Sequence, residues 1–350
     1  MNSKERFKPR GQTFYGVEMF RGIAALMVVF YHISRHFEQN FGVMPFSKAT
    51  GFGHAGVDFF FVLSGFIILF IHRSDIGQPS HVLNYIKKRT ARIYPFYWFM
   101  VVITMVLIPF VSSASFPGVE NLLKQFVLWP QGMNNLIIGV SWTLEFEVLF
   151  YLLFALLILN RWVGTPVLFV WLAAVVANNY LGLLHIESPV ILSAFNIEFF
   201  MGMVCAYLLS LFELKYGFYI LLAGVLAFGA VAYSEVSGLI DGYGAMARIY
   251  YGVASMLLIT GMVSWERQGT VYIPRLGKLL GRSSFSIYLS HLFFAGIVYK
   301  ALAVAGVLAI LPYYVGALLV ISLVLGLAVL CSVCIELPLT RKTRNILLRA

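Results

Sequence analysis

The stretch PYYVGALLVISLVLGLAVLCSVCI, residues 312–335, contains no charged side chain. At about 1.5 Å of rise per residue, a helix of this length exceeds the roughly 30 Å of hydrocarbon in a lipid bilayer. An uncharged apolar run of this length is typical of a transmembrane helix. The C-terminal part of the chain is therefore predicted to be embedded in a membrane.

Comparable apolar stretches recur along the rest of the chain. Of all residues, 60% are hydrophobic and 11% are charged, and the mean hydropathy is +0.86. A soluble domain carries about a quarter charged residues. We predict an all-α integral membrane protein with about ten transmembrane helices, forming one membrane-embedded domain over residues 1–350. The expected spans are 16–34, 54–71, 94–112, 141–159, 165–184, 190–212, 216–234, 244–264, 283–305 and 312–335, and residues 113–140 are expected to be a re-entrant or surface-lying segment.

Lys and Arg are distributed unevenly between alternate loops. Nineteen of the 25 lie in the two terminal segments and the even-numbered loops, whereas the odd-numbered loops hold only Arg35, Lys48 and Lys124. Loops rich in Lys and Arg remain on the cytoplasmic side of a membrane. Both termini are therefore predicted to be cytoplasmic. The net charge of +10 is explained by topology, and nucleic acid is not an expected partner.

Ionisable side chains also lie inside the predicted spans, where each charge costs about 2.5–3.5 kcal/mol. They are Glu18, Arg21, His32, Asp58, Glu145, Glu147, Glu198, Arg248, His291 and Lys300. Arg248 and Lys300 are expected to extend along the helix to the membrane surface. The others require a partner or a function.

The first predicted helix places Arg21 and His32 on one face. They are eleven residues apart, a rotation of about 1100°, or some 20° beyond three full turns. Glu18 precedes Arg21 by one turn and could pair with it. An aligned Glu, Arg and His are better explained by a polar cavity than by packing alone.

The second loop ends in a basic run, Lys87-Lys88-Arg89-Thr90-Ala91-Arg92, before the aromatic segment that starts at Tyr94. One interpretation is a cytoplasmic charge cluster that meets an aromatic belt. The alternative is an anion clamp, because Arg89 and Arg92 are one helical turn apart and guanidinium groups grip phosphates through two hydrogen bonds.

Five motifs resemble, in order, the signatures of the acyltransferase-3 family. They are RGIAALMVVFYH (Arg21–His32), GVDFFFVLSGF (Gly56–Phe66), RTARIYPFYW (Arg89–Trp98), SWTLEFEVLFY (Ser141–Tyr151) and SSFSIYLSH (Ser283–His291). The closing IELP at Ile335–Pro338 is also similar to the family's ending. The resemblance implies a membrane O-acyltransferase of surface glycans, of the stand-alone exopolysaccharide or lipopolysaccharide O-acetyltransferase type, located in the bacterial inner membrane as a multi-pass protein.

The resemblance also implies the substrates and the roles of individual residues. The donor would be cytoplasmic acyl-coenzyme A, usually acetyl-coenzyme A, and the acceptor a hydroxyl of a glycan or lipid-linked sugar. No metal is implied. The expected catalytic residues are His32, Arg21 and Glu147, the expected coenzyme-binding residues are Arg89 and Arg92, and the expected substrate-binding or supporting residues are Asp58, Ser64, Glu145, Ser286 and His291.

The residue chemistry agrees with this expectation. A sugar hydroxyl needs a base when it attacks a thioester, and a histidine is suited to that role near neutral pH. A carboxylate such as Glu147 could orient the imidazole. Direct transfer and an acyl-histidine intermediate both remain open. The alternative function is a secondary transporter or a flippase of a lipid-linked glycan, since buried Glu, Arg and His also serve proton relays.

Overall fold

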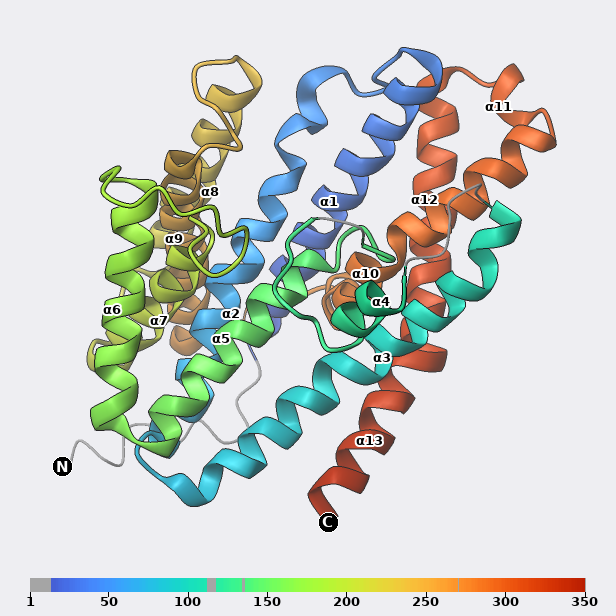
Figure 1. Cartoon of the computed structure of the whole chain (residues 1–350). Coiled ribbons are helices and arrows are strands. Elements are labelled where there is room, and N and C mark those ends of the chain that lie inside the picture. Colours follow the sequence, from blue (N-terminus) through green and yellow to red (C-terminus); the bar gives the residue numbers. More distant parts are fainter. Residues whose placement is uncertain (1–13, 112–117, 134–135, 270, 350) are drawn as a thin grey trace. The chain divides into compact units, whose positions relative to one another are not determined.

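The computed structural model describes residues 14–111, 118–133, 136–269 and 271–349, and every regular element in these ranges is helical (Figure 1). The α-helices are α1 (Tyr15–Phe41), α2 (Gly56–His72), α3 (Val82–Val111), α4 (Val119–Phe126), α5 (Trp142–Leu159), α6 (Arg161–Asn179), α7 (Asn196–Leu211), α8 (Gly217–Val236), α9 (Ala245–Gln268), α10 (Arg275–Val304), α11 (Val307–Ile310), α12 (Tyr313–Cys331) and α13 (Leu337–Arg349). Short 3₁₀ segments are η1 (Ser47–Ala55), η2 (Arg73–Asp75) and η3 (Pro79–His81), and η4 (Ser332–Glu336) is a π-helical turn. The predicted all-α class is confirmed.

Nine helical segments in the described ranges are long and apolar enough to cross a membrane. Each of them overlaps one of nine predicted spans. The remaining prediction, 190–212, corresponds to the apolar helix α7, which has 16 residues. The α7 helix is shorter than predicted because the side chain of Asn196 donates hydrogen bonds to the carbonyls of Val190 and Ile191 and so holds the preceding segment in a turn.

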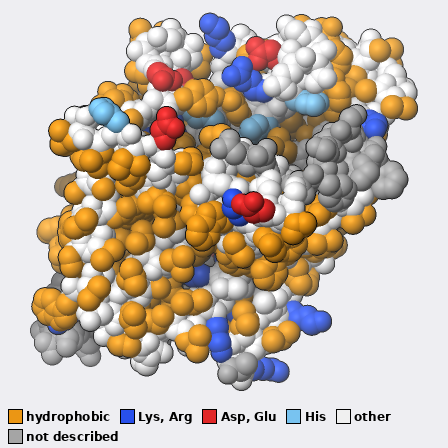
Figure 2. Space-filling model, viewed as in Figure 1, with side chains coloured by type: hydrophobic (Ala, Val, Ile, Leu, Met, Phe, Trp, Pro, Cys, Tyr) orange, Lys and Arg blue, Asp and Glu red, His pale blue; other side chains and the backbone are white. Residues whose placement is uncertain are grey.

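The outer surface of the helices is apolar, as expected when lipid is the solvent. Trp162, Phe169 and Val170 on α6 and Leu226 on α8 are among many exposed large hydrophobic residues. Figure 2 shows hydrophobic side chains over most of the visible face, with charged groups in a few isolated places. Polar side chains such as Asp58, Glu198 and His291 are instead fully buried.

The chain forms two compact units that alternate along the sequence. The first comprises described residues 14–24, 55–79 and 156–281, and the second comprises 25–54, 80–155 and 282–349. Helices α1 and α10 each contribute to both units, so the division does not mark a boundary along the sequence. The single domain over residues 1–350 stays a prediction.

In the first unit, α2 packs closely against α7, and α8 against α9. Gly65 of α2 faces the backbone of Phe199, and Gly202 of α7 faces the backbone of Val62. A Cβ atom at either glycine would overlap the facing main chain. Small residues permit this close approach of helices within membranes.

In the second unit, α13 packs along α3, and α10 is tied to α12 by a hydrogen bond from the Ser286 hydroxyl to the Ala328 carbonyl. Part of the loop predicted at 113–140 folds as α4. The buried Gln125 of α4 accepts a hydrogen bond from the Tyr97 hydroxyl at its carbonyl and one from the Ile137 amide at its side chain. These bonds fix the loop against α3.

Candidate functional site

Helix α1 carries two of the three predicted catalytic residues. It is continuous from Tyr15 to Phe41, which confirms that Arg21 and His32 belong to one helix. Its first turn is capped by Glu266 of α9, whose carboxylate accepts a hydrogen bond from the Gly16 amide at 2.9 Å. Glu18 Oε2 is buried without a hydrogen-bond partner among the described residues, and the pairing of Glu18 with Arg21 stays a prediction.

His32 lies against His291 of α10. Their ring centroids are 5.2 Å apart and their planes are inclined by 40°. His291 is fully buried, whereas His32 is partly exposed. The two residues come from opposite ends of the sequence, and α1 and α10 bring their side chains together within the second unit.

The hydrogen bonds of His291 determine which of its nitrogens is available. Its Nδ1 donates to the carbonyl oxygens of Tyr288, at 2.6 Å, and Ile287, at 3.2 Å. Carbonyl oxygens only accept, so Nδ1 carries the proton and the neutral ring keeps its lone pair on Nε2. Among the described residues, Nε2 has no hydrogen-bond partner. A buried acceptor without a partner is unusual and marks a place for a ligand or water.

A third histidine, His54 of η1, belongs to the same cluster. The ring of Tyr31 lies 5.0 Å from that of His32 and 5.7 Å from that of His54, and the two histidines interact electrostatically. The preceding Gly53 lets η1 approach α1, because a Cβ there would overlap the Met27 carbonyl. The sequence interpretation missed His54, which is the first residue of the predicted span 54–71 and lies in the 3₁₀ segment η1.

The two carboxylates of α5 have different surroundings. Glu145 is 2% exposed and accepts hydrogen bonds from the backbone amides of Gln131, at 3.0 Å, and Gly132, at 2.7 Å. These two bonds hold the loop at Gln131 and Gly132 against α5. Glu147 is partly exposed and interacts electrostatically with the hydroxyls of Tyr151 and Tyr288.

Tyr288 connects Glu147 to the histidine cluster. Its ring centroid is 6.1 Å from that of His291. The predicted contact between Glu147 and His32 stays a prediction. The structure adds a tyrosine between the carboxylate and the buried imidazole.

The two arginines of α3 both contact other side chains of the second unit. The Arg89 guanidinium lies between the rings of Tyr85 and Tyr151, at 5.6 and 5.4 Å from their centroids. Arg92 lies 5.2 Å from the ring centroid of Phe285 and forms an ion pair of 3.5 Å with Glu336.

Glu336 is fully buried and also accepts a hydrogen bond of 2.7 Å from the Ser332 hydroxyl. It is the last residue of η4, directly before α13. The Arg92–Glu336 pair therefore joins α3 to the junction between α12 and α13. The side chain of Arg92 remains one-third exposed.

The first unit contains a separate buried cluster of charged groups. Arg248 of α9 lies 2.7 Å from the Asp58 carboxylate of α2 and interacts electrostatically with Glu198 of α7. Its guanidinium also donates to the Gly242 carbonyl and covers the ring of Phe195. The prediction that Arg248 extends to the membrane surface is wrong: it is 2% exposed because its partners Asp58 and Glu198 are themselves fully buried.

Tyr180, at the end of α6, lies beside this cluster. Its side chain interacts electrostatically with Glu198, and its hydroxyl donates to the Ala245 carbonyl at 2.9 Å.

The predicted site residues are thus distributed over both units. Within the second unit it brings His32 and His291 into contact and supplies Glu147, Glu145, Ser286, Arg89 and Arg92. Arg21, Asp58 and Ser64 belong to the first unit. The described residues contain no group of three or more His, Cys, Asp or Glu side chains able to hold a metal ion.

These features define a multi-pass helical membrane protein with titratable groups in its interior. The chain belongs to the acyltransferase-3 family, whose acyltransferase domain matches residues 14–337. It is 32% identical over 312 residues to the exopolysaccharide production protein ExoZ of Rhizobium meliloti (strain 1021), covering 83% of this chain and 91% of that protein. It is also 34% identical over 87 residues to protein 2 in the picA locus of Rhizobium radiobacter, covering 25% of this chain and 41% of that protein. No solved structure matches the chain.

The family assignment confirms the resemblance inferred from the five motifs, and the protein is a membrane acyltransferase.

Proposed function

We propose that the protein transfers an acyl group, in the first place acetyl, from acyl-coenzyme A to a hydroxyl of an exopolysaccharide or of its lipid-linked precursor. Membership of the acyltransferase-3 family supports the class of reaction. The similarity to a relative named for exopolysaccharide production supports the acceptor. The observation that carries the chemistry is the contact between His32 and His291.

In the proposed reaction, His32 removes the proton of the sugar hydroxyl while the hydroxyl oxygen attacks the thioester carbonyl. The new ester bond forms as the carbon–sulfur bond breaks, and the proton passes from His32 to the departing coenzyme A sulfur. A positioned base of this kind contributes roughly 10²–10⁴-fold to a rate. In the alternative route the imidazole itself takes the acyl group before the sugar arrives.

His291 supports this step through its lone pair. Its Nδ1–H is held by backbone carbonyls, so Nε2 can accept a hydrogen bond from the reacting hydroxyl or from a protonated His32. Stabilising an imidazolium inside a membrane requires such an acceptor. Glu147 interacts with Tyr288 and would add a negative charge on the side of the histidine cluster where Tyr288 lies.

The coenzyme would approach from the cytoplasm of a bacterial cell whose inner membrane holds the protein. The uneven distribution of Lys and Arg between loops supports cytoplasmic termini and a cytoplasmic α3 start. Arg89 and Arg92 lie on this part of α3, and we assign them to the pyrophosphate of the donor.

The test is transfer of label by the purified protein in vesicles of neutral lipid. Acetyl-coenzyme A labelled in the acetyl group is supplied with exopolysaccharide from cells that lack the protein. The proposal predicts label in the polysaccharide that hydroxylamine releases, as expected for an ester. Label that stays on the donor, combined with movement of lipid-linked glycan across the vesicle membrane, would support the transporter or flippase instead.

A further inference from the structure

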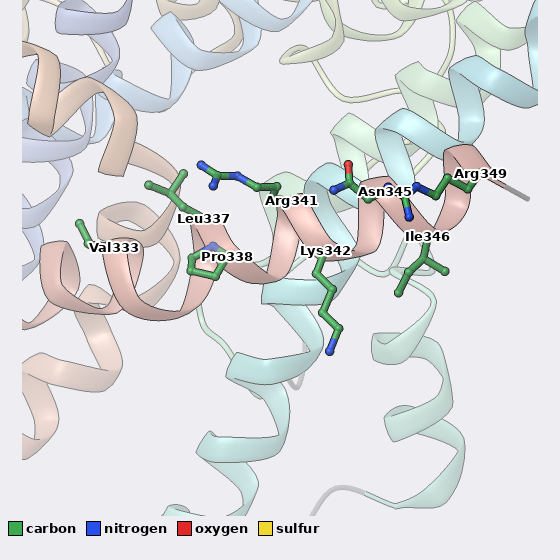
Figure 3. Close-up of a pocket in the computed structure, with 8 residues that line it drawn as sticks. All are labelled: Val333, Leu337, Pro338, Arg341, Lys342, Asn345, Ile346 and Arg349. Atoms are coloured by element: carbon green, nitrogen blue, oxygen red, sulfur yellow. The ribbon is translucent and has the colours of Figure 1, made fainter.

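A basic cleft runs along the C-terminal helix α13. It has a volume of about 690 Å³, which lies in the range of small-molecule sites. Three cations line it, Arg341, Lys342 and Arg349, together with the amide of Asn345. Figure 3 shows Arg341, Asn345 and Arg349 following one another at four-residue intervals along one side of the helix.

The charge of α13 is of one sign. Its sequence, LPLTRKTRNILLR, contains no acidic residue. The three cations of the cleft are exposed, so their charges are available to a ligand. The described residues that line the cleft include no carboxylate. Two guanidinium groups and an ammonium suit a phosphate ester, because a guanidinium can bind two phosphate oxygens at once.

The other end of the cleft is apolar. Val333 of η4 and Leu337 at the start of α13 line it where the chain leaves the membrane-spanning helix α12. A ligand that fits this distribution has phosphate groups at one end and an uncharged, flexible arm that leads toward the membrane.

The cleft adjoins the arginines already assigned to the donor. Helix α13 begins directly after Glu336, whose carboxylate pairs with Arg92, and α13 packs along α3. Arg92 and Arg89 each have partners inside the protein, whereas Arg341 and Arg349 line the cleft and lie along the same side of α13 (Figure 3). The positive surface that begins on α3 therefore continues onto α13.

From these contacts we infer that the α13 cleft binds the phosphorylated nucleotide of coenzyme A, with the ribose 3′-phosphate on Arg341 and Arg349. The assignment rests on the proposed use of acyl-coenzyme A as donor. The pyrophosphate lies toward Arg92, and the pantetheine arm passes Leu337 and Val333 into the membrane. Glu336 is a positioning residue that holds α13 beside α3.

The experiment measures binding of coenzyme A and of 3′-dephospho-coenzyme A to the full-length protein in discs of neutral phosphatidylcholine. The variant R341Q/R349Q removes two cations from the cleft. The matched control R282Q/R344Q removes two exposed arginines that do not line it. The cleft variant should raise the dissociation constant of coenzyme A roughly tenfold to a hundredfold, the range for loss of charge-assisted contacts. The control should stay close to the parent protein.

Because 3′-dephospho-coenzyme A lacks only the ribose 3′-phosphate, it tests whether the cleft binds that phosphate. It should bind the parent protein more weakly than coenzyme A does, and R341Q/R349Q should change its binding little. Equal losses of coenzyme A affinity in R341Q/R349Q and in the control would overturn the inference, as would unchanged affinity in both. If R341Q/R349Q leaves coenzyme A binding unchanged but reduces the preference of the protein for phosphatidylglycerol in discs of mixed lipid, the cleft is a lipid headgroup site. That result would also overturn the inference.

Failure of the cleft assignment can be distinguished from failure of the proposed function. If the parent protein transfers acetyl groups from acetyl-coenzyme A and R341Q/R349Q leaves the KM for this donor unchanged, only the cleft assignment fails. If the parent protein neither binds coenzyme A nor transfers its acetyl group, the donor itself is wrong.

Discussion

The imidazole rings of His32 and His291 face each other at 5.2 Å between centroids, one from α1 and the other from α10. One ring is partly exposed, and the other is fully buried with its Nδ1–H bound to backbone carbonyls. This difference supports different proposed roles for the two rings. In the proposed mechanism His32 is the ring that meets the substrate, and His291 is the hydrogen-bond acceptor behind it.

The first prediction concerns His32. His32→Ala should reduce acyl transfer by about 10²–10⁴-fold, the usual contribution of a general base, without loss of protein from the membrane. The matched control is His36→Ala, one turn further along α1, where the ring packs on Tyr299 at 4.3 Å instead of on His291. Transfer rates are compared at equal protein amounts. A His32 variant as active as the His36 variant would exclude His32 as the general base.

The second prediction separates the two glutamates of α5. Glu145→Gln should retain most of the activity, because the amide oxygen of Gln can still accept the bonds from Gln131 and Gly132. Glu147→Gln removes a negative charge near Tyr288 and should lower kcat. Steady-state kinetics on both variants checks this. The reverse order, with Glu145→Gln inactive and Glu147→Gln normal, would show that Glu145 is the catalytic carboxylate.

The third prediction concerns topology. Reporter fusions at Ala350 and in the loop near Lys48 should report opposite sides of the membrane, with Ala350 in the cytoplasm. The reason is that nineteen Lys and Arg residues lie on one set of loops and three on the other. Two fusions that report the same side would contradict the ten-span arrangement, including α7 as a crossing helix.

The fourth prediction concerns the buried cluster of the first unit. Arg248→Met leaves the carboxyl groups of Asp58 and Glu198 buried without their cation. Breaking a buried ion pair on one side typically costs about 3–5 kcal/mol, so the melting temperature in detergent should fall clearly. Arg161→Met, at an exposed position on α6, is the control and should melt like the parent. Equal melting temperatures for the two variants would mean that the pair does not stabilise the fold.

Much of the fold follows from local sequence patterns. Uncharged stretches such as 312–335 predicted helices that the structure contains, because length and hydropathy are properties of a single segment. The limits of α7 were not predictable in this way, since they depend on Asn196 binding the carbonyls of the turn before it.

The site was predicted less completely, for a physical reason. Helical periodicity places Arg21 and His32 on one face of one helix, but it says nothing about contacts between distant segments. The contact of His32 with His291, the pair of Arg92 with Glu336 and the burial of Arg248 against Asp58 all arise from packing of separate helices. His54 was missed because it stands at the edge of the predicted span 54–71, and its place beside Tyr31 arises from packing of η1 against α1.

The proposed acyl transfer through His32 can be checked by mass spectrometry of the exopolysaccharide from three strains. One strain makes the parent protein, one makes His32→Ala at the same level, and one makes neither. Repeating units from the parent strain alone should be heavier by one acyl group, with acetyl as the expected group. Repeating units of equal mass in all three strains, or the added acyl group in the His32→Ala strain, would contradict it.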